Sequence, residues 1–234
     1  AYEGGALIAL NSSWDSAALG LHAAFDSTQE WLVETVRHLL DQTSVPVLVR
    51  QHPVERLPIA RSNDDYGTLL NHHFGKNPRL HFISAHEPVN SYELMGQVCA
   101  VIVYTSTVGV EAAAQGKIVI TESNSYYANL GFVHNAETPS DYFNLLDRAV
   151  AGELKVSASM RDDAIAAYYI TQCCNWVHTP LTVPDFPSWS HRSLNDLADD
   201  PAVRKVVDAI EGNVPIAFLN HIENGAARAP TSDV

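Results

Sequence analysis

Cationic residues are scarce in this chain of 234 residues. It has 14 Lys and Arg against 27 Asp and Glu, which gives a formal net charge of −13. Because the phosphate backbone of a nucleic acid is bound by clustered Lys and Arg, this deficit argues against a nucleic-acid partner. A small anion would have to be held by a few cations together with backbone dipoles.

Cysteine is rare as well. Three Cys residues are too few for a disulfide framework, and two of them, Cys173 and Cys174, are neighbours on a predicted helix, where their side chains point apart. No spacing of His and Cys residues suggests a metal site. The sequence therefore predicts a cytoplasmic protein with reduced thiols and no structural metal.

Long apolar runs are missing. No stretch reaches the roughly 18 apolar residues of a membrane span, and the first residues carry no basic leader before an apolar core. Neither a spanning helix nor a signal peptide is expected. Apolar residues nevertheless make up 46% of the chain and charged residues only 18%, a composition that fills a globular core.

What the chain does contain is an alternation of short apolar runs and amphipathic segments. Strands are predicted at 6–10, 45–49, 80–83, 100–104 and 117–121. Helices are predicted at 27–42, 66–74, 91–97, 108–115 and 138–150. This order predicts an α/β domain, a Rossmann-like parallel sheet with flanking helices whose strands present their carboxyl ends to one cleft.

The domain organisation follows from the same pattern. We expect a Rossmann-like domain over residues 1–155, a helical extension packed on it over residues 156–223, and a loose tail over residues 224–234. The extension is expected to hold a helix at 157–176, an irregular crossing at 177–190, and helix at 193–210 broken by Pro201.

One candidate anion site lies in the segment VYTSTVGVEAAAQGK, residues 103–117. Thr105, Ser106 and Thr107 fall at the turn between an apolar strand and an Ala-rich helix, where hydroxyls and free N–H groups can hold a phosphate. The alternative is that Ser106 or Thr107 only caps the helix. Glu111, one turn into the helix, either accepts hydrogen bonds from ribose hydroxyls or faces solvent.

A second candidate lies in VLVRQHP, residues 47–53. Arg50 and His52 follow a strand, and Pro53 restrains His52 to an extended backbone, from which the imidazole can donate to a phosphate or act on a leaving group. The alternative is an ordinary surface histidine. Glu87, after the next strand, falls on the same sheet edge and either contacts a base or ribose or belongs to an exposed acidic loop.

These motifs together resemble the nucleotide-binding half of the bacterial capsule-polysaccharide glycosyltransferases, above all the Kdo (3-deoxy-D-manno-octulosonic acid) transferases that use CMP-Kdo. The resemblance rests on [KR]-x-H-P at residues 50–53, on [ST]-S-T-x-G-x-E-A at residues 105–112, and on the Gly-Lys strand and Tyr-Tyr loop that follow, and it covers about residues 6–132. Arg50 stands where these enzymes usually carry Lys, which keeps the charge but replaces a point charge by a planar fork.

The resemblance also implies roles for residues in two loops. The strand at 6–10 followed by Asn11, Asp15 and Ser16 resembles the family's Q-x-x-x-D-S, with Asn11 in place of Gln. Asp15 is implied as a catalytic carboxylate facing the cleft and Ser16 as a substrate contact, whereas the alternative for Asp15 is a loop residue that caps a helix. Tyr126 and Tyr127 are implied as substrate contacts.

The function implied is that of the carboxyl-terminal donor domain of a GT-B glycosyltransferase. It would transfer Kdo or a related acidic sugar from a CMP-sugar, its donor substrate, to a capsule or lipopolysaccharide glycan or glycolipid, with no separate cofactor. His52 and Arg50 would stabilise the charge on the departing phosphate.

Other parts of the assembly are expected elsewhere. A GT-B enzyme has two such domains and the strands here suffice for one, so the acceptor domain is expected in a longer protein or a partner chain, with attachment to the inner membrane only through partners. The rival readings are a CDP-glycerol or CDP-ribitol phosphotransferase and a non-catalytic assembly module.

Overall fold

The computed structural model describes residues 2–179 and 190–220. Their contacts divide the chain into two compact units, Ala1–Ile165 and Ala166–Val234, and each is described by itself. The division falls ten residues beyond the boundary expected at residue 155. The tail expected at 224–234 and most of the crossing expected at 177–190 lie outside the described residues.

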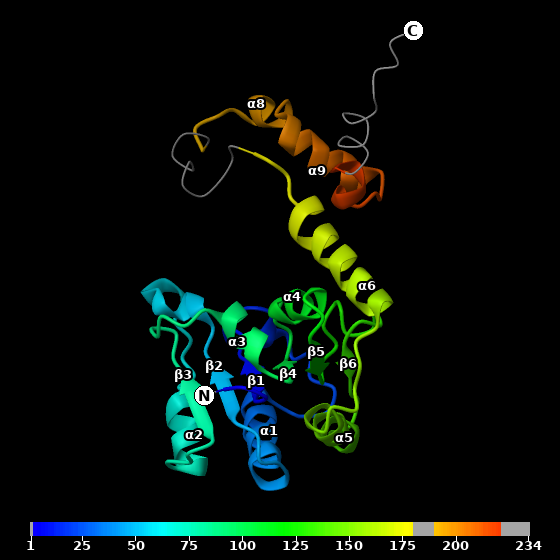
Figure 1. Cartoon of the computed structure of the whole chain (residues 1–234). Coiled ribbons are helices and arrows are strands. Elements are labelled where there is room, and N and C mark those ends of the chain that lie inside the picture. The colour runs from blue at the N-terminus through cyan, green and yellow to red at the C-terminus, as the bar shows by residue number, and fades with distance from the viewer. Residues whose placement is uncertain (1, 180–189, 221–234) are drawn as a thin grey trace. The chain divides into compact units, whose positions relative to one another are not determined.

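A six-stranded sheet forms the centre of the first unit (Figure 1). Its strands are β1 (Ala6–Ala9), β2 (Val47–Arg50), β3 (Leu80–Ile83), β4 (Ala100–Val103), β5 (Ile118–Thr121) and β6 (His134–Asn135). They lie in the order β3-β2-β1-β4-β5-β6, and every neighbouring pair is parallel. This is the doubly wound order of a Rossmann-like sheet, so the predicted fold is confirmed. The two-residue strand β6 was not predicted, because two residues are too few to show a periodicity.

Helices cover both faces of this sheet. Figure 1 shows α1 (Thr28–Gln42), α2 (Tyr66–Phe74) and α5 (Pro139–Val150) on one face, and α3 (Ser91–Gln97) and α4 (Val108–Ala114) on the other. Every residue of β1, β2 and β4 is buried, which explains why their sequences are almost uninterrupted apolar runs.

The core on the α1 side is built around large aromatic residues. Trp31 of α1 and Tyr142 of α5 are fully buried, and the indole N–H of Trp31 donates to the hydroxyl of Tyr142 at 2.9 Å. The ring of Tyr104, just past β4, completes this core. Burying these rings while their polar atoms find partners holds the helices firmly against the sheet.

The loops that leave the carboxyl ends of β1 and β2 contain short 3-10 turns: η1 (Ser16–Leu19), η2 (Pro53–Arg56) and η3 (Pro58–Ala60). Asp15 caps η1 and His52 caps η2 with their side chains. The residues predicted for a binding site are therefore held by local turns and do not extend freely from the sheet edge.

The predicted helix at 157–176 differs in its second half. It is α-helical as α6 (Ala158–Tyr168) and continues as a π-helix, η4 (Tyr169–Cys174). Later in the second unit, α8 (Leu194–Ala198) and α9 (Pro201–Glu211) are separate helices, as the position of Pro201 predicted. Pro201 occupies the first turn of α9, where its missing N–H costs no hydrogen bond.

None of the helices in the described ranges combines the length and the hydropathy needed to cross a bilayer.

Candidate functional site

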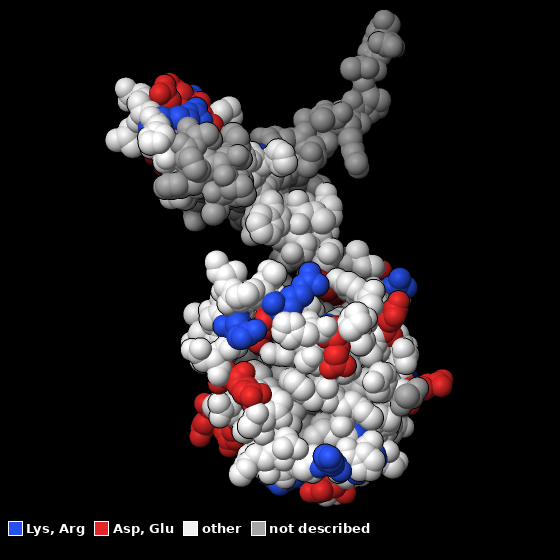
Figure 2. Space-filling view, turned by 90° about the vertical axis from the view of Figure 1, so that its left-hand side faces the viewer, with Lys and Arg blue, Asp and Glu red and all other residues white. Residues whose placement is uncertain are grey.

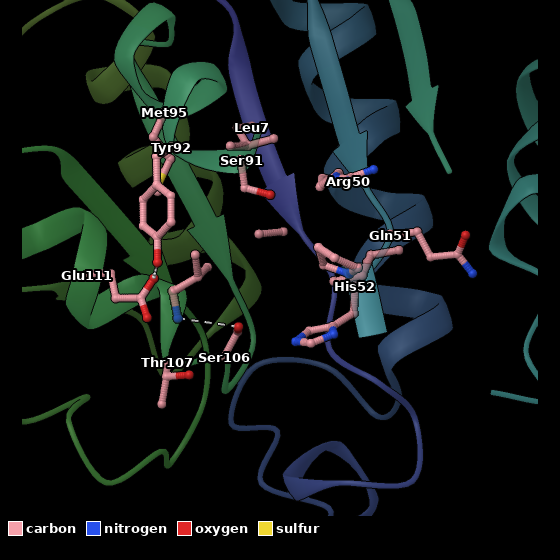
Figure 3. A pocket seen from close by; sticks show the side chains of 14 residues that line it. Leu7, Arg50, Gln51, His52, Ser91, Tyr92, Met95, Ser106, Thr107 and Glu111 are labelled. Carbon is pink, nitrogen blue, oxygen red and sulfur yellow. Dashed lines mark hydrogen bonds between the residues drawn. The ribbon is translucent and has the colours of Figure 1, made fainter. Parts of the chain in front are cut away.

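A pocket of about 260 Å³ opens at the carboxyl ends of β1, β2 and β4 (Figure 3). It lies where the order of the strands reverses direction around β1 and β4, the position at which open α/β sheets bind ligands. Its lining combines apolar side chains with a few polar ones and comprises Leu7, Ala9, Leu10, Arg50, Gln51, His52, Pro53, Ser91, Tyr92, Met95, Ser106, Thr107, Val108 and Glu111.

Arg50, the last residue of β2, carries a buried positive charge beside this pocket. The side chain is 4% exposed, and its two Nη atoms donate to the backbone carbonyls of Ser84, at 2.5 Å, and Val89, at 3.2 Å. Its Nε is buried without a hydrogen-bond partner among the described residues. Burial lowers the pKa of Arg50, and the nearby Glu87 carboxylate opposes that shift. A desolvated cation held only by carbonyls favours an anionic ligand.

The hydrogen bonding of Arg50 differs from the expectation that its planar guanidinium binds a phosphate. Both Nη groups of Arg50 are engaged with the loop that precedes α3, so only the Nε side of the guanidinium is uncommitted. The charge is also not part of a surface patch. Figure 2 shows Lys and Arg as small separate groups among acidic and neutral side chains on the described face of the first unit.

His52 is oriented by its own turn. The Nδ1 atom accepts a hydrogen bond from the Val54 N–H at 3.2 Å, so a neutral ring carries its proton on Nε2. Burial lowers the pKa of His52, while Asp15 and Glu55 raise it and Arg50 lowers it further. In Figure 3 the ring faces Ser106 across the mouth of the pocket. His52 thus presents a neutral N–H donor to a ligand, and its backbone is extended as Pro53 predicted.

The turn into α4 has only a weak side-chain cap, which comes from Ser106. Thr107 is the N-cap residue, but it has a helical backbone and its side chain makes no capping bond. The Oγ of Ser106 accepts from the Val108 N–H only at 3.4 Å, a long contact. Ser106 is almost fully buried, whereas Thr107 is exposed at the pocket mouth. The Ser106 hydroxyl is therefore available to donate to a ligand.

The first loop is tied to this turn. The hydroxyls of Ser16 and Thr105 lie 2.9 Å apart, and the Oδ1 of Asn11 accepts from the Thr105 N–H at 3.3 Å. Asp15 does what the alternative reading proposed, because its Oδ1 accepts from the Ala17 N–H at 3.0 Å and caps η1. Asp15, Ser16 and Thr105 do not line the pocket. The charge of Asp15 still acts on His52, whose pKa it raises.

Tyr127 lies in the core instead of at a substrate-facing surface. It is fully buried, and its hydroxyl donates to the Ser106 carbonyl at 2.7 Å, so it supports the turn from behind. Tyr126 is 52% exposed, packs edge-to-face on Tyr127 and is not part of the pocket lining. Adjacent residues of a loop point in different directions, and only Tyr126 remains accessible.

Glu111 and Glu87 occupy different environments. Glu111 lines the pocket from α4, and its Oε2 accepts from the Tyr92 hydroxyl of α3 at 2.9 Å. Glu87 is exposed outside the lining, and its Oε1 accepts from the Ser84 N–H at 2.8 Å. Tyr92 was missed by sequence reasoning, because helical spacing alone does not show which neighbour a helix faces.

A buried hydrogen bond between His22 and Glu122 fastens the far end of the first loop and was also missed. The His22 Nδ1 and a Glu122 carboxylate oxygen lie 2.6 Å apart, and the other oxygen accepts from the N–H groups of Ala23 and Ala24. The His22 ring stacks on Tyr104 at 3.9 Å. The two residues are 100 positions apart, so no local pattern joins them.

A family model described as "Capsule polysaccharide biosynthesis protein" matches residues 6–174. None of the curated proteins matches this chain.

Similar solved structures include two enzymes of Thermosulfurimonas dismutans. The KpsC β-Kdo 2,7-transferase is 18% identical over 70% of this chain and 45% of its own, with a TM-score of 0.43. The KpsC β-Kdo 2,4-transferase is 15% identical over 70% of this chain and 44% of its own, with a TM-score of 0.45. A putative UDP-N-acetylglucosamine 2-epimerase from Listeria monocytogenes is 12% identical over 91% and 45%, with a TM-score of 0.44. The chain spans less than half the length of each.

Proposed function

The chain belongs to the capsule polysaccharide biosynthesis protein family, and from that premise we propose that it is the donor-binding part of a glycosyltransferase that uses a CMP-sugar. The sugar proposed is Kdo or a related acidic sugar, and the acceptor a capsule or lipopolysaccharide glycan or glycolipid. The pocket at the sheet edge would bind CMP.

The observation that carries this proposal is the buried charge of Arg50. Its Nε lacks a partner among the described residues, and the pocket that it lines also presents the Nε2–H of His52 and the hydroxyl of Ser106. A phosphate is acceptor-only and anionic, so it would accept hydrogen bonds from His52 and Ser106 while the buried charge of Arg50 attracts it. Their removal from bulk water strengthens each contact.

In the proposed reaction, the bond between the anomeric carbon and the CMP phosphate oxygen breaks and a bond to an acceptor hydroxyl oxygen forms. His52 and Ser106 would donate to the phosphate as its charge grows, and the fixed cation of Arg50 would stabilise the same charge from behind. Asp15 would receive the acceptor proton. Pro53 would hold His52 in place.

The other candidate residues would take supporting positions around this centre. Thr107 would meet the donor at the pocket mouth, and Glu111 would accept from ribose hydroxyls. The Ser16–Thr105 hydrogen bond and the buried Tyr127 would hold the loops that carry the donors. Glu87 and Tyr126, both exposed, would be reached only by parts of the substrate that extend beyond the pocket.

The size of the pocket supports a divided site. Its volume of about 260 Å³ is below the roughly 300–1,000 Å³ of pockets that enclose whole ligands. It suits a nucleoside monophosphate better than a complete CMP-sugar. A second Rossmann-like domain, in a longer protein or a partner chain, would supply the rest of the cleft and bind the acceptor, and membrane attachment would come through such partners.

Calorimetric titration of the 234-residue chain with CMP, CDP, UDP and GDP tests the proposal. We expect CMP to bind most tightly and the isolated chain to transfer sugar poorly, because the proposed second domain would supply half of the cleft. A preference for CDP would favour a CDP-polyol phosphotransferase. Binding of no nucleotide would make the chain a non-catalytic assembly module, and fast transfer by the chain alone would contradict the divided site.

A further inference from the structure

We propose that Tyr92 and Glu111 form a ribose-reading pair that distinguishes ribonucleotides from 2′-deoxyribonucleotides. The inference rests on the proposed function, because it concerns the nucleoside held in the same pocket. It adds Tyr92 as a positioning residue and assigns different parts of the nucleotide to the two ends of the pocket.

The pair joins two helices across one wall of the pocket. Tyr92 lies in the first turn of α3 and Glu111 in α4, and the phenol oxygen and the carboxylate Oε2 are 2.9 Å apart. Both side chains line the pocket. Figure 3 shows them on the side opposite Arg50 and His52, with Ser106 between the two groups.

The chemistry of the pair dictates what can lie against it. An ionised carboxylate only accepts hydrogen bonds, and the phenol already donates to Oε2. The second oxygen of Glu111, Oε1, can accept from a further donor, which a hydroxyl supplies and a phosphate does not. The other side of the pocket has the opposite preference. There His52 and Ser106 offer hydrogen-bond donors and Arg50 offers a positive charge, so that side favours an anionic acceptor group. The pocket thus has an anion end and a hydroxyl end.

A ribonucleoside monophosphate has this same arrangement. Its phosphate and its vicinal 2′ and 3′ hydroxyls lie at different positions of one sugar ring, so the phosphate can occupy the Arg50 end while the diol reaches Glu111. Apolar side chains of Leu7, Met95 and Val108 complete the lining and offer a surface to the base. A 2′-deoxynucleotide would leave the carboxylate with one fewer donor.

Tyr92 acts through Glu111 in this arrangement. The phenol holds the carboxylate in one orientation and links α3 to α4, although the Tyr92 side chain is itself 52% exposed. Removing the hydroxyl should therefore weaken the reading of ribose without affecting the phosphate contacts. A residue with a merely structural role would change the affinities for CMP and dCMP equally.

The test is calorimetric titration of the full chain with CMP and with dCMP. Because a hydrogen bond to a charged group corresponds to roughly ten- to a hundredfold in affinity, the unaltered chain should prefer CMP by about that factor. Glu111→Ala should lower the affinity for CMP more than the affinity for dCMP, which keeps only the 3′ hydroxyl, so that the two nucleotides bind about equally. Tyr92→Phe should lower the CMP preference several-fold. Glu93→Gln, an exposed residue of α3, and Tyr168→Phe, in the second unit, are matched controls that should keep the full preference.

The outcomes separate this inference from the proposed function. Equal binding of CMP and dCMP by the unaltered chain, or a preference that survives Glu111→Ala, overturns the ribose-reading pair while CMP binding stands. Binding of neither nucleotide overturns both. If Glu111→Ala fails to fold, as melting curves would show, Glu111→Gln keeps the shape and removes the charge, and it should reduce the preference in the same direction.

Discussion

The hydroxyl of Tyr127 donates a hydrogen bond of 2.7 Å to the backbone carbonyl of Ser106. This contact places a fully buried ring directly behind the turn that presents the Ser106 hydroxyl to the pocket. Gly109, in the first turn of α4, packs against the same ring: a Cβ atom there would lie 2.9 Å from the Tyr127 oxygen and 3.0 Å from a methyl of Val103. Packing of Tyr127 and Gly109 in the core therefore helps to fix the conformation of the turn that carries Ser106.

We predict that Gly109→Ala destabilises the protein by about 1–3 kcal/mol, the usual cost of overpacking. In a Tyr127→Phe background the cost should be smaller, because the nearest atom has been removed, although the contact with Val103 remains. Urea unfolding of the two single variants and the double variant measures this coupling. Gly96→Ala is the control, since a Cβ there meets nothing within 4 Å and should add helix propensity. Equal costs in both backgrounds would contradict the packing argument.

Two substitutions of His52 distinguish the capping role of Nδ1 from the proposed phosphate-binding role of Nε2. Asn at this position keeps an acceptor for the Val54 N–H but has no counterpart of Nε2–H. We expect His52→Asn to leave stability nearly unchanged and to weaken CMP binding by about 1.5–3 kcal/mol, or roughly ten- to a hundredfold. His52→Gln, which can reach the phosphate but not the cap, should show the reverse. Calorimetry and melting curves of both variants check the two expectations.

Ser106→Ala should weaken CMP binding by a similar factor. Because His52 and Ser106 would contact one phosphate, the double variant should differ from the sum of the singles. The long Ser106 contact to Val108 predicts only a small loss of stability. If neither single variant changes CMP affinity, the phosphate site is not where we propose it.

The stability of the protein should fall on mild acidification, partly through His52. Burial lowers the pKa of this ring, so the unfolded chain binds a proton at a higher pH than the folded chain. The stability contributed by the neutral ring is present above about pH 6.5 and is lost as the pH falls through the lower folded pKa. His134, whose pKa is lowered by burial and by Arg148, adds to the same trend. Urea unfolding between pH 7.5 and 5 should therefore show a shallower decline for His52→Asn than for the unaltered chain, and parallel curves would refute the role of His52.

Binding of CMP should stabilise the folded protein, and most of this stabilisation should depend on Arg50. Because Arg50→Met removes the donors to the carbonyls of Ser84 and Val89, it should cost about 1–3 kcal/mol. CMP at about a hundred times its dissociation constant should stabilise the unaltered chain by about 2.7 kcal/mol. The same concentration should stabilise Arg50→Met far less. Thermal unfolding with and without CMP provides the measurement, and Arg37→Met, a half-exposed arginine of α1, is the control. Equal stabilisation of both proteins by CMP would remove Arg50 from the anion site.

The fold was predictable because its main signals are local. The strands β1, β2, β4 and β5 are short, mostly apolar runs, and their alternation with amphipathic helices determines a parallel sheet. Local signals also explain the misses. The apolar spacing of residues 157–176 continues past Tyr168, and it cannot show that the hydrogen-bonding pattern changes there to that of a π-helix.

The candidate site was predictable only in part. Residues that directly follow a parallel strand, such as His52 and Ser106, must reach the same edge, so their proximity followed from the fold. Which of two adjacent tyrosines is buried depends on how the loop crosses α4, and the sequence suggested a surface role for Tyr127 that its burial does not support. The contacts Tyr92–Glu111 and His22–Glu122 join elements distant in the chain, and only their packing reveals them.

The central place of β1 has a consequence for how the protein is made. Ala6 pairs with Val47 on one side and with Ala100 on the other, so β1 has one permanent neighbour, β4, that is translated much later than β1 itself. Until β4 leaves the ribosome, one edge of β1 is an open apolar strand able to pair with other chains. Such distant pairings also slow folding. We therefore expect the nascent chain to depend on chaperones until β4 has been synthesised.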